Sequence, residues 1–221
     1  MKTAVITGAN RGIGLELARL LRASHQVHAV CRSSSPELEA LGVEILEGID
    51  VTCSDGIAVL AARLADKEID LLVNNAGLLR SSSLENIETE LDDWRAQYEV
   101  NALAPLRVSA ALDGRLVAGS KLVIITSRMG SMADNSSGGA YAYRMSKAAV
   151  NSAGVSLAHA LRPRGITVAL LHPGYVRTGM TGGNRHIDPA QAAAQLLEQI
   201  EALEIEDSGC FRHANGEVLP W

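Results

Sequence analysis

Short apolar runs alternate along this chain with longer segments whose apolar residues recur at helical spacing. Six of the runs predict buried strands, at residues 3–7, 27–31, 43–46, 70–73, 121–125 and 166–171. Helical spacing follows from residue 13 onward and again over residues 57–64, 91–112 and 143–161, and a last short strand is expected around a turn at Asn215 and Gly216. No linker or repeat interrupts this alternation. It predicts an α/β fold in which one domain, residues 1–221, forms a Rossmann-type doubly wound parallel sheet with helices on both faces.

Composition narrows the possible partners and the cellular setting. The chain has 221 residues, 47% of them hydrophobic and 20% charged, which is ordinary for one soluble globular domain. A net charge of -5 gives no electrostatic reason to bind nucleic acid or a membrane surface. We expect neither a signal peptide nor a membrane span, because glycine and polar residues interrupt the N-terminal segment and no apolar run approaches membrane-spanning length. Three widely spaced cysteines, Cys31, Cys53 and Cys210, argue against disulfides and against a metal site, so we expect a cytoplasmic protein without a metal.

A glycine-rich turn, TGANRGIG at residues 7–14, joins the first predicted strand to the first helix. Its glycines, Gly8, Gly12 and Gly14, are spaced differently from the better-known dinucleotide fingerprint but serve the same physical purpose. They allow the backbone to approach a pyrophosphate, and the helix N-terminus offers it unpaired N–H groups. A tight connection without any ligand would use the same residues. The strands and helices that follow favour the cofactor-binding interpretation.

The end of the second predicted strand indicates which cofactor would bind. An NAD-binding unit places an acidic residue there for the ribose 2′-hydroxyl, whereas this chain has Arg32, Ser33 and Ser34. An arginine suits a 2′-phosphate because it forms charge-assisted hydrogen bonds, and Arg11 in the glycine turn could reach the same group. A single arginine after a strand is usually only solvated. The two together predict NADPH/NADP+, with NADH as the less favoured cofactor.

Polar and small residues follow the next predicted strands. Asp50 could accept a hydrogen bond from an adenine amino group or serve as a turn residue, and the NNAG segment at residues 74–77 could support a flat ligand or simply a turn. Asn101 is an unusual residue within an apolar helical stretch unless its amide bonds another group. Ser127 follows the fifth strand, and ligands of parallel α/β sheets bind outside the carboxyl ends of strands.

Tyr143 and Lys147 lie four residues apart on the longest predicted helix. Side chains at that spacing share one helical face, so a phenol and an ammonium group are held side by side. A neighbouring cation favours the phenolate and lowers the tyrosine pKa, which moves the phenol toward use as an acid or base near neutral pH. The same spacing also arises by chance on solvated helices. The pair gains meaning from the cofactor and Ser127 signals.

Together these segments resemble the short-chain dehydrogenase/reductase family over essentially the whole chain. The resemblance lies in TGANRGIG at 7–14, Asp50-Val51, NNAG at 74–77, Asn101, Ser127, YRMSK at 143–147 and HPGYVRT at 172–178. The stretch GGAYAYRMSKAAVN and the final NGEVLPW are most similar to the C-factor and Sniffer-like carbonyl reductase branch. This resemblance implies an enzyme that interconverts a small-molecule carbonyl and alcohol with a nicotinamide cofactor.

The resemblance also implies roles for individual residues. Tyr143 would exchange a proton with the substrate oxygen, and Lys147 would lower the Tyr143 pKa and bond the nicotinamide ribose. Ser127 would polarise the substrate oxygen, and Asn101 would position a water that links Lys147 to solvent. The residues expected to contact the cofactor are Gly8, Asn10, Arg11, Gly12, Ile13, Gly14, Arg32, Ser33, Asp50, Val51, Asn75, Ala76, Gly77, Tyr143, Lys147, Pro173, Gly174, Val176 and Thr178.

We therefore expect an NADPH-dependent oxidoreductase that reduces an aldehyde, ketone or quinone. The alternative is a dinucleotide-binding signalling or sensor protein of the C-factor type with little turnover. The complete set of Ser127, Tyr143 and Lys147 favours the enzyme, because a sensor needs none of them. The helices predicted over 91–112 and 143–161 are apolar beyond one stripe. With the family resemblance, that predicts a homodimer or homotetramer.

Overall fold

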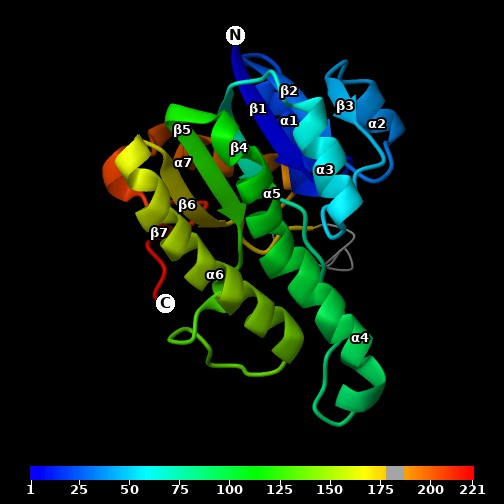
Figure 1. Cartoon of the computed structure of the whole chain (residues 1–221). Helices are drawn as coiled ribbons and strands as arrows, with labels where there is room; N and C mark the ends of the chain where they lie inside the picture. The colour runs from blue at the N-terminus through cyan, green and yellow to red at the C-terminus, as the bar shows by residue number, and fades with distance from the viewer. Residues whose placement is uncertain (178–186) are drawn as a thin grey trace.

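A parallel β-sheet forms the centre of the molecule, and helices cover both of its faces (Figure 1). The computed structural model describes residues 1–177 and 187–221. The strands are β1 (Lys2–Thr7), β2 (His25–Val30), β3 (Glu44–Leu46), β4 (Ile69–Asn74), β5 (Leu116–Ile125), β6 (Thr167–His172) and β7 (Cys210–His213). Their order is β3-β2-β1-β4-β5-β6-β7, and all these pairings are parallel. The predicted doubly wound sheet is confirmed, and its topological switch point lies between β1 and β4.

The helices divide into two layers. They are α1 (Gly12–Leu21), α2 (Pro36–Glu39), α3 (Ser54–Arg63), α4 (Ile87–Tyr98), α5 (Ala104–Leu112), α6 (Tyr141–Leu161) and α7 (Pro189–Ala202). α1 packs against α7 on one face of the sheet, while α3, α5 and α6 cover the other face. In the described parts of the chain, no helix has both the length and the hydropathy needed to cross a bilayer.

Two aliphatic cores lie on opposite faces of the sheet, because successive residues of each strand point to opposite sides. In β1, Val5 belongs to the core under α3, α5 and α6, whereas Ala4 and Ile6 belong to the core under α1 and α7. Strands buried on both faces read as nearly continuous apolar runs, which is why the sequence pattern located them. The helices cover the faces of the sheet, so a binding site is expected at the carboxyl ends of the strands, and α4 extends beyond that edge (Figure 1).

The helical stretch predicted over residues 91–112 is continuous but not regular. It begins earlier, at Ile87, and changes to a π-helical turn over Glu99–Leu103 before α5. Asn101 lies at the centre of this π turn. Single π turns inside α-helices occur frequently at functional sites. Asn101, an unusual residue for the interior of an α-helix, therefore lies where the helix changes to a π-helical turn.

The C-terminal segment folds back on β7, as the pattern around Asn215 and Gly216 predicted. Gly216 has a φ of +92°, and Val218 pairs antiparallel with Arg212. The Leu219 N–H donates to the Phe211 carbonyl at 2.9 Å. This C-terminal hairpin, residues 210–219, places its return arm beside the carboxyl edge of the sheet.

Candidate active site

A cavity of about 910 Å³ opens at the carboxyl ends of the strands. That volume is in the upper part of the range found for small-molecule and cofactor sites. Its walls come from the glycine turn, the ends of β2 and β4, the segment after β3 and the start of α6. The predicted site residues that line it are Gly8, Asn10, Arg11, Gly12, Ile13, Arg32, Ser33, Asp50, Val51, Asn75, Ala76, Gly77, Tyr143, Lys147 and Pro173. One cavity therefore unites residues from most of the sequence.

Several predicted site residues lie outside the lining of this cavity. Asn101 and Ser127 are buried next to residues that line it, and Gly14, Gly174 and Val176 are likewise not part of its lining. Gly174 has a φ of +88°, in the left-handed region that favours glycine, so its backbone conformation is what calls for glycine there. Thr178, the remaining prediction, lies outside the described residues.

The glycine turn and the start of α1 fit a pyrophosphate. Gly8 and Gly12 have φ values of +66° and +57°, in the left-handed region where glycine carries no steric penalty. At the N-terminus of α1, the N-cap residue Arg11 makes no side-chain capping hydrogen bond, and the first turn contains no acidic residue. The first N–H groups of the helix are therefore available to an anion.

Gly14 and Asn75 join the glycine turn to the NNAG segment. A Cβ on Gly14 would lie 2.4 Å from the Gly8 carbonyl oxygen and 2.5 Å from the Asn75 side-chain nitrogen. Asn75 Nδ2 donates to the carbonyls of Thr7 at 2.9 Å and Gly8 at 3.2 Å. The Thr7 hydroxyl accepts from the N–H groups of Asn75 at 3.0 Å and Ala76 at 3.1 Å. The Asn75 side chain thus holds a turn, while the backbone beside it lines the cavity.

Arg11 and Arg32 lie at the end of the cavity formed by β2. Both side chains are exposed and line the cavity with Ser33. Asp50 lies nearby, and its pKa is lowered chiefly by hydrogen bonds from Thr52 and to a smaller extent by Arg32. Asp50 Oδ1 accepts from the Thr52 hydroxyl at 2.7 Å and its N–H at 2.9 Å. Asp50 Oδ1 therefore acts as a turn acceptor. The other interpretation, a hydrogen bond from an adenine amino group, stays a prediction.

Tyr143, Lys147 and Ser127 meet in the interior at the other end of the cavity. Tyr143 is 9% exposed and Lys147 is 4% exposed. Lys147 Nζ donates to the Ile125 carbonyl at 3.0 Å and lies 5.8 Å from the centroid of the Tyr143 ring. The Ser127 hydroxyl is hydrogen-bonded to the Tyr143 phenol, and Ser127 Oγ accepts from the Met129 N–H at 3.1 Å. A phenol, an ammonium and an oriented hydroxyl are therefore in mutual reach.

Burial sets the protonation of this group. It raises the pKa of Tyr143 to about 12, and the smaller opposing effect is the Ser127 hydrogen bond. Burial also lowers the pKa of Lys147 to about 8. The expected lowering of the Tyr143 pKa is wrong for this arrangement, because burial of the phenol is the largest influence and the opposing Ser127 hydrogen bond is weaker. Tyr143 is held as a neutral acid at pH 7.

The Asn101 amide is fully engaged by protein groups. Its Oδ1 accepts from the Leu78 N–H at 2.8 Å, and its Nδ2 donates to the Leu78 carbonyl at 2.8 Å and to Ser146 Oγ at 3.0 Å. Leu78 follows the NNAG segment and lines the cavity. Asn101 therefore fixes a wall of the site. Its expected role in positioning a water stays a prediction.

Gln97 is a site-supporting residue that the sequence did not reveal. It lies one helical turn before Asn101, and its side chain is completely buried. Its Oε1 accepts from the Arg80 N–H at 3.1 Å, and its Nε2 donates to the Asp93 carbonyl at 3.3 Å. Gln97 and Asn101 thus hold alternate residues of one extended segment. The available signal was a second amide four residues from Asn101.

Further charged residues of the cavity were also missed. Arg80, Glu99 and Arg177 line it, and Arg80 forms an ion pair with Asp93. Each stands in a polar stretch of the sequence that resembles an ordinary solvated surface. Among the described residues, no cluster of His, Cys, Asp and Glu side chains has a metal-binding arrangement.

Comparisons with known proteins agree with this geometry. The short chain dehydrogenase family matches residues 2–188. The chain is 40% identical over 228 residues, all of both chains, to 1-hydroxy-2-glutathionyl-2-methyl-3-butene dehydrogenase of Rhodococcus sp. (strain AD45). It is 41% identical over 165 residues to the C-signal protein of Myxococcus xanthus, covering 73% of this chain and 98% of that protein.

Solved structures that are similar over the whole chain include two carbonyl reductases. The carbonyl reductase Sniffer of D. melanogaster has a TM-score of 0.91 at 29% identity, with 100% of both chains covered. The NADPH-bound carbonyl reductase from chicken fatty liver has a TM-score of 0.88 at 30% identity, covering 100% of this chain and 99% of that chain. The predicted resemblance to Sniffer-like and C-factor proteins is confirmed.

Proposed function

The chain belongs to the short-chain dehydrogenase/reductase family, and on this premise we propose that it reduces an aldehyde, ketone or quinone to an alcohol with NADPH. The observation that carries the proposal is the buried Tyr143 phenol, hydrogen-bonded to Ser127 and lining the same cavity as the glycine turn. With a pKa of about 12, this phenol is protonated at neutral pH and can give its proton to a carbonyl oxygen directly.

Each side chain of the group has a distinct task in this proposal. NADPH, when bound, supplies the hydride. Tyr143 donates the proton, and Ser127 hydrogen-bonds the substrate oxygen while negative charge develops on it. The Lys147 ammonium, 5.8 Å from the centroid of the phenol ring, stabilises the phenolate that remains after proton transfer. Lys147, with a pKa of about 8, is mostly charged at pH 7.

The choice of NADPH rests on the end of the cavity beside β2. Arg11 and Arg32 line it, and no acidic residue directly follows β2 to bind a ribose 2′-hydroxyl. Charge-assisted hydrogen bonds from arginine suit a 2′-phosphate. The chicken carbonyl reductase with a similar fold binds NADPH, as its name states, which supports the same choice here.

The test is a panel of aldehydes, ketones and quinones followed by NADPH absorbance, with Tyr143→Phe as the matched variant. We expect turnover by the parent, and a loss of about 100-fold or more in kcat for Tyr143→Phe with NADPH binding retained. Parent and variant with equal turnover would contradict the role of Tyr143. NADPH binding without turnover of any carbonyl would instead favour signalling, the role that similarity to the C-signal protein suggests.

A second candidate is the oxidation of an alcohol that carries a glutathionyl group. The Rhodococcus relative is named for such a substrate and matches over its whole length. In this chain, Arg80 and Arg177 line the cavity in addition to the residues assigned to the cofactor, and arginine is suited to binding carboxylates such as those of glutathione. A higher kcat/KM with NADP+ and a glutathionyl alcohol than with any carbonyl of the panel would favour this reaction.

We also propose a cytoplasmic, two-fold symmetric assembly. The three cysteines of the chain are free, which fits a reducing compartment. Exposed apolar side chains of α4 and α6, among them Tyr98 and Met145, provide surface for a partner copy. Light scattering at micromolar concentration should give the mass of a dimer or tetramer, and a monomeric mass would contradict this assembly.

A further inference from the structure

The Ser127 hydroxyl is oriented by a short turn to which the proposed function has assigned no role. Ser127 is the N-cap of a 3₁₀ turn, Arg128–Gly130, and accepts a hydrogen bond from the Met129 N–H at 3.1 Å. On one side this turn is pressed against α6, since a Cβ on Gly130 would lie 2.8 Å from the Lys147 carbonyl. The turn therefore touches the helix that carries Tyr143 and Lys147.

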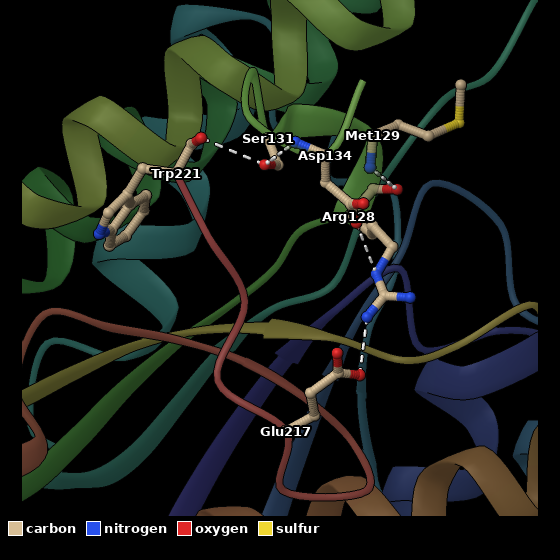
Figure 2. Close-up of polar contacts among 7 residues, drawn as sticks. Arg128, Met129, Ser131, Asp134, Glu217 and Trp221 are labelled. Atoms are coloured by element: carbon tan, nitrogen blue, oxygen red, sulfur yellow. Dashed lines mark hydrogen bonds and ion pairs between the residues drawn. The ribbon is translucent and has the colours of Figure 1, made fainter. Parts of the chain in front are cut away.

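On its other side the turn is fastened by the Arg128 guanidinium, which spans two carboxylates (Figure 2). Arg128 NH2 lies 2.7 Å from Glu217 Oε2, and Arg128 Nε lies 3.0 Å from Asp134 Oδ2. Asp134 belongs to the loop that follows the turn, whereas Glu217 belongs to the return arm of the C-terminal hairpin. One side chain thus joins the turn both to the loop that follows it and to a hairpin 89 residues farther along the sequence.

The backbones of both acidic residues are themselves held in place. The Glu217 N–H donates to Asn215 Oδ1 at 3.0 Å, and the Glu217 carbonyl accepts from the His213 N–H at 2.8 Å. The Asp134 N–H donates to Ser131 Oγ at 3.0 Å, and Ser131 Oγ in turn donates to the Trp221 carbonyl at 3.2 Å (Figure 2). Arg128 is therefore paired with two residues whose backbones are anchored.

We propose that Arg128 is a positioning residue of the reaction: by pairing with Asp134 and Glu217 together, it holds the turn that orients the Ser127 hydroxyl against Tyr143. This inference rests on the proposed reductase function. Surface ion pairs contribute little to global stability, and all three side chains are between 37% and 52% exposed. The value of the arrangement is geometric, because a displacement of about 1 Å at a reacting group can reduce turnover as much as 100-fold.

The test compares Arg128→Met, Glu217→Gln and the double variant with a matched control, Arg164→Met. Arg164 pairs with Asp113 and is 41% exposed, the same fraction as Arg128, but it precedes β6 and lies away from the carboxyl edge. For Arg128→Met we expect kcat to fall about 10- to 100-fold, with the substrate KM and the NADPH Kd within about threefold of the parent. Arg164→Met should keep the parent kcat.

Coupling between the partners supplies the second criterion. Glu217→Gln should lower kcat less than Arg128→Met does, and the double variant should be no worse than Arg128→Met alone, because both changes break one contact. Arg128→Lys should recover part of the loss, since a single ammonium can pair with one carboxylate at a time. If Arg128→Met does not fold, Glu217→Gln alone must show the selective loss of kcat.

Three results would overturn the proposal. They are a kcat within twofold of the parent for Arg128→Met, a fall matched by equal weakening of NADPH binding, or additive losses in the double variant. An inactive parent enzyme is a different outcome, because it contradicts the proposed function before any variant is compared.

Discussion

Replacing the buried Gln97 by methionine should weaken both the fold and the active-site wall. Methionine has nearly the same length and volume but no hydrogen-bonding amide, so the change isolates the two polar contacts. Gln97 Oε1 accepts from the Arg80 N–H at 3.1 Å, and Nε2 donates to the Asp93 carbonyl at 3.3 Å. The side chain is 0% exposed, so the amide is removed from bulk solvent.

The expected magnitude follows from these contacts. An ordinary intramolecular hydrogen bond contributes about 1 kcal/mol net, and leaving the partly buried Arg80 N–H without an acceptor costs about 1–3 kcal/mol. We therefore expect the free energy of unfolding to fall by about 2–4 kcal/mol in Gln97→Met. Because the glycine turn is untouched, the NADPH Kd should stay near that of the parent, while kcat/KM falls as the Leu78–Arg80 wall shifts.

Urea denaturation at pH 7 measures the stability change, with Gln191→Met as the matched control. Gln191 is exposed on α7, so its replacement should change the unfolding free energy by less than about 0.5 kcal/mol. Gln97→Glu keeps an acceptor for the Arg80 N–H but loses the donor to the Asp93 carbonyl. It should show whether the acceptor accounts for most of the stability change. A stability change in Gln97→Met no larger than in Gln191→Met would refute the reasoning.

Two further predictions concern charge. Arg32→Asp should weaken NADPH binding by roughly 10- to 150-fold and leave NADH binding unchanged or improved, because a charge-assisted contact contributes about 1.5–3 kcal/mol. Fluorescence titration of both cofactors measures the two affinities. Equal affinities of the parent protein for NADH and NADPH would contradict the prediction. The pKa of His172 is lowered from 6.5 to about 3, chiefly by burial and then by His213, Arg128 and Lys147, so the unfolded state binds more protons below pH 6.5 and stability falls as pH decreases. His172→Gln should therefore lose about 2 kcal/mol less than the parent between pH 7 and pH 5, and identical slopes in urea denaturation would refute this.

The strands and the cofactor turn could be predicted because buried parallel strands are apolar throughout and glycines mark the turn. The first half of β5, Leu116–Ser120, could not. Its residues are partly polar and include Gly119, and it is held by Ser120, whose hydroxyl accepts from the Val117 N–H at 2.9 Å and donates to the Ile69 carbonyl at 2.7 Å. Such a contact between distant segments leaves no periodic signal.

The same limit applies to the site. Tyr143, Lys147 and Ser127 were identified from spacing and strand ends, but the direction of the Tyr143 pKa shift depends on how deeply the phenol is buried, which spacing does not encode. Gln97 reads as a surface residue of an amphipathic helix. Its burial results from the segment around Arg80 packing over it, a tertiary event that helical periodicity cannot express.

The cross-link that Thr7 and Asn75 make between the glycine turn and the NNAG segment has a kinetic consequence. These contacts hold two neighbouring loops at the switch point in one fixed arrangement, so the dinucleotide meets a surface that needs no ordering. Association should then proceed at a rate set by diffusion and by the exposed arginines. Substitutions at the nucleotide contacts that leave this cross-link intact should change mainly the dissociation rate of the cofactor, and its association rate much less.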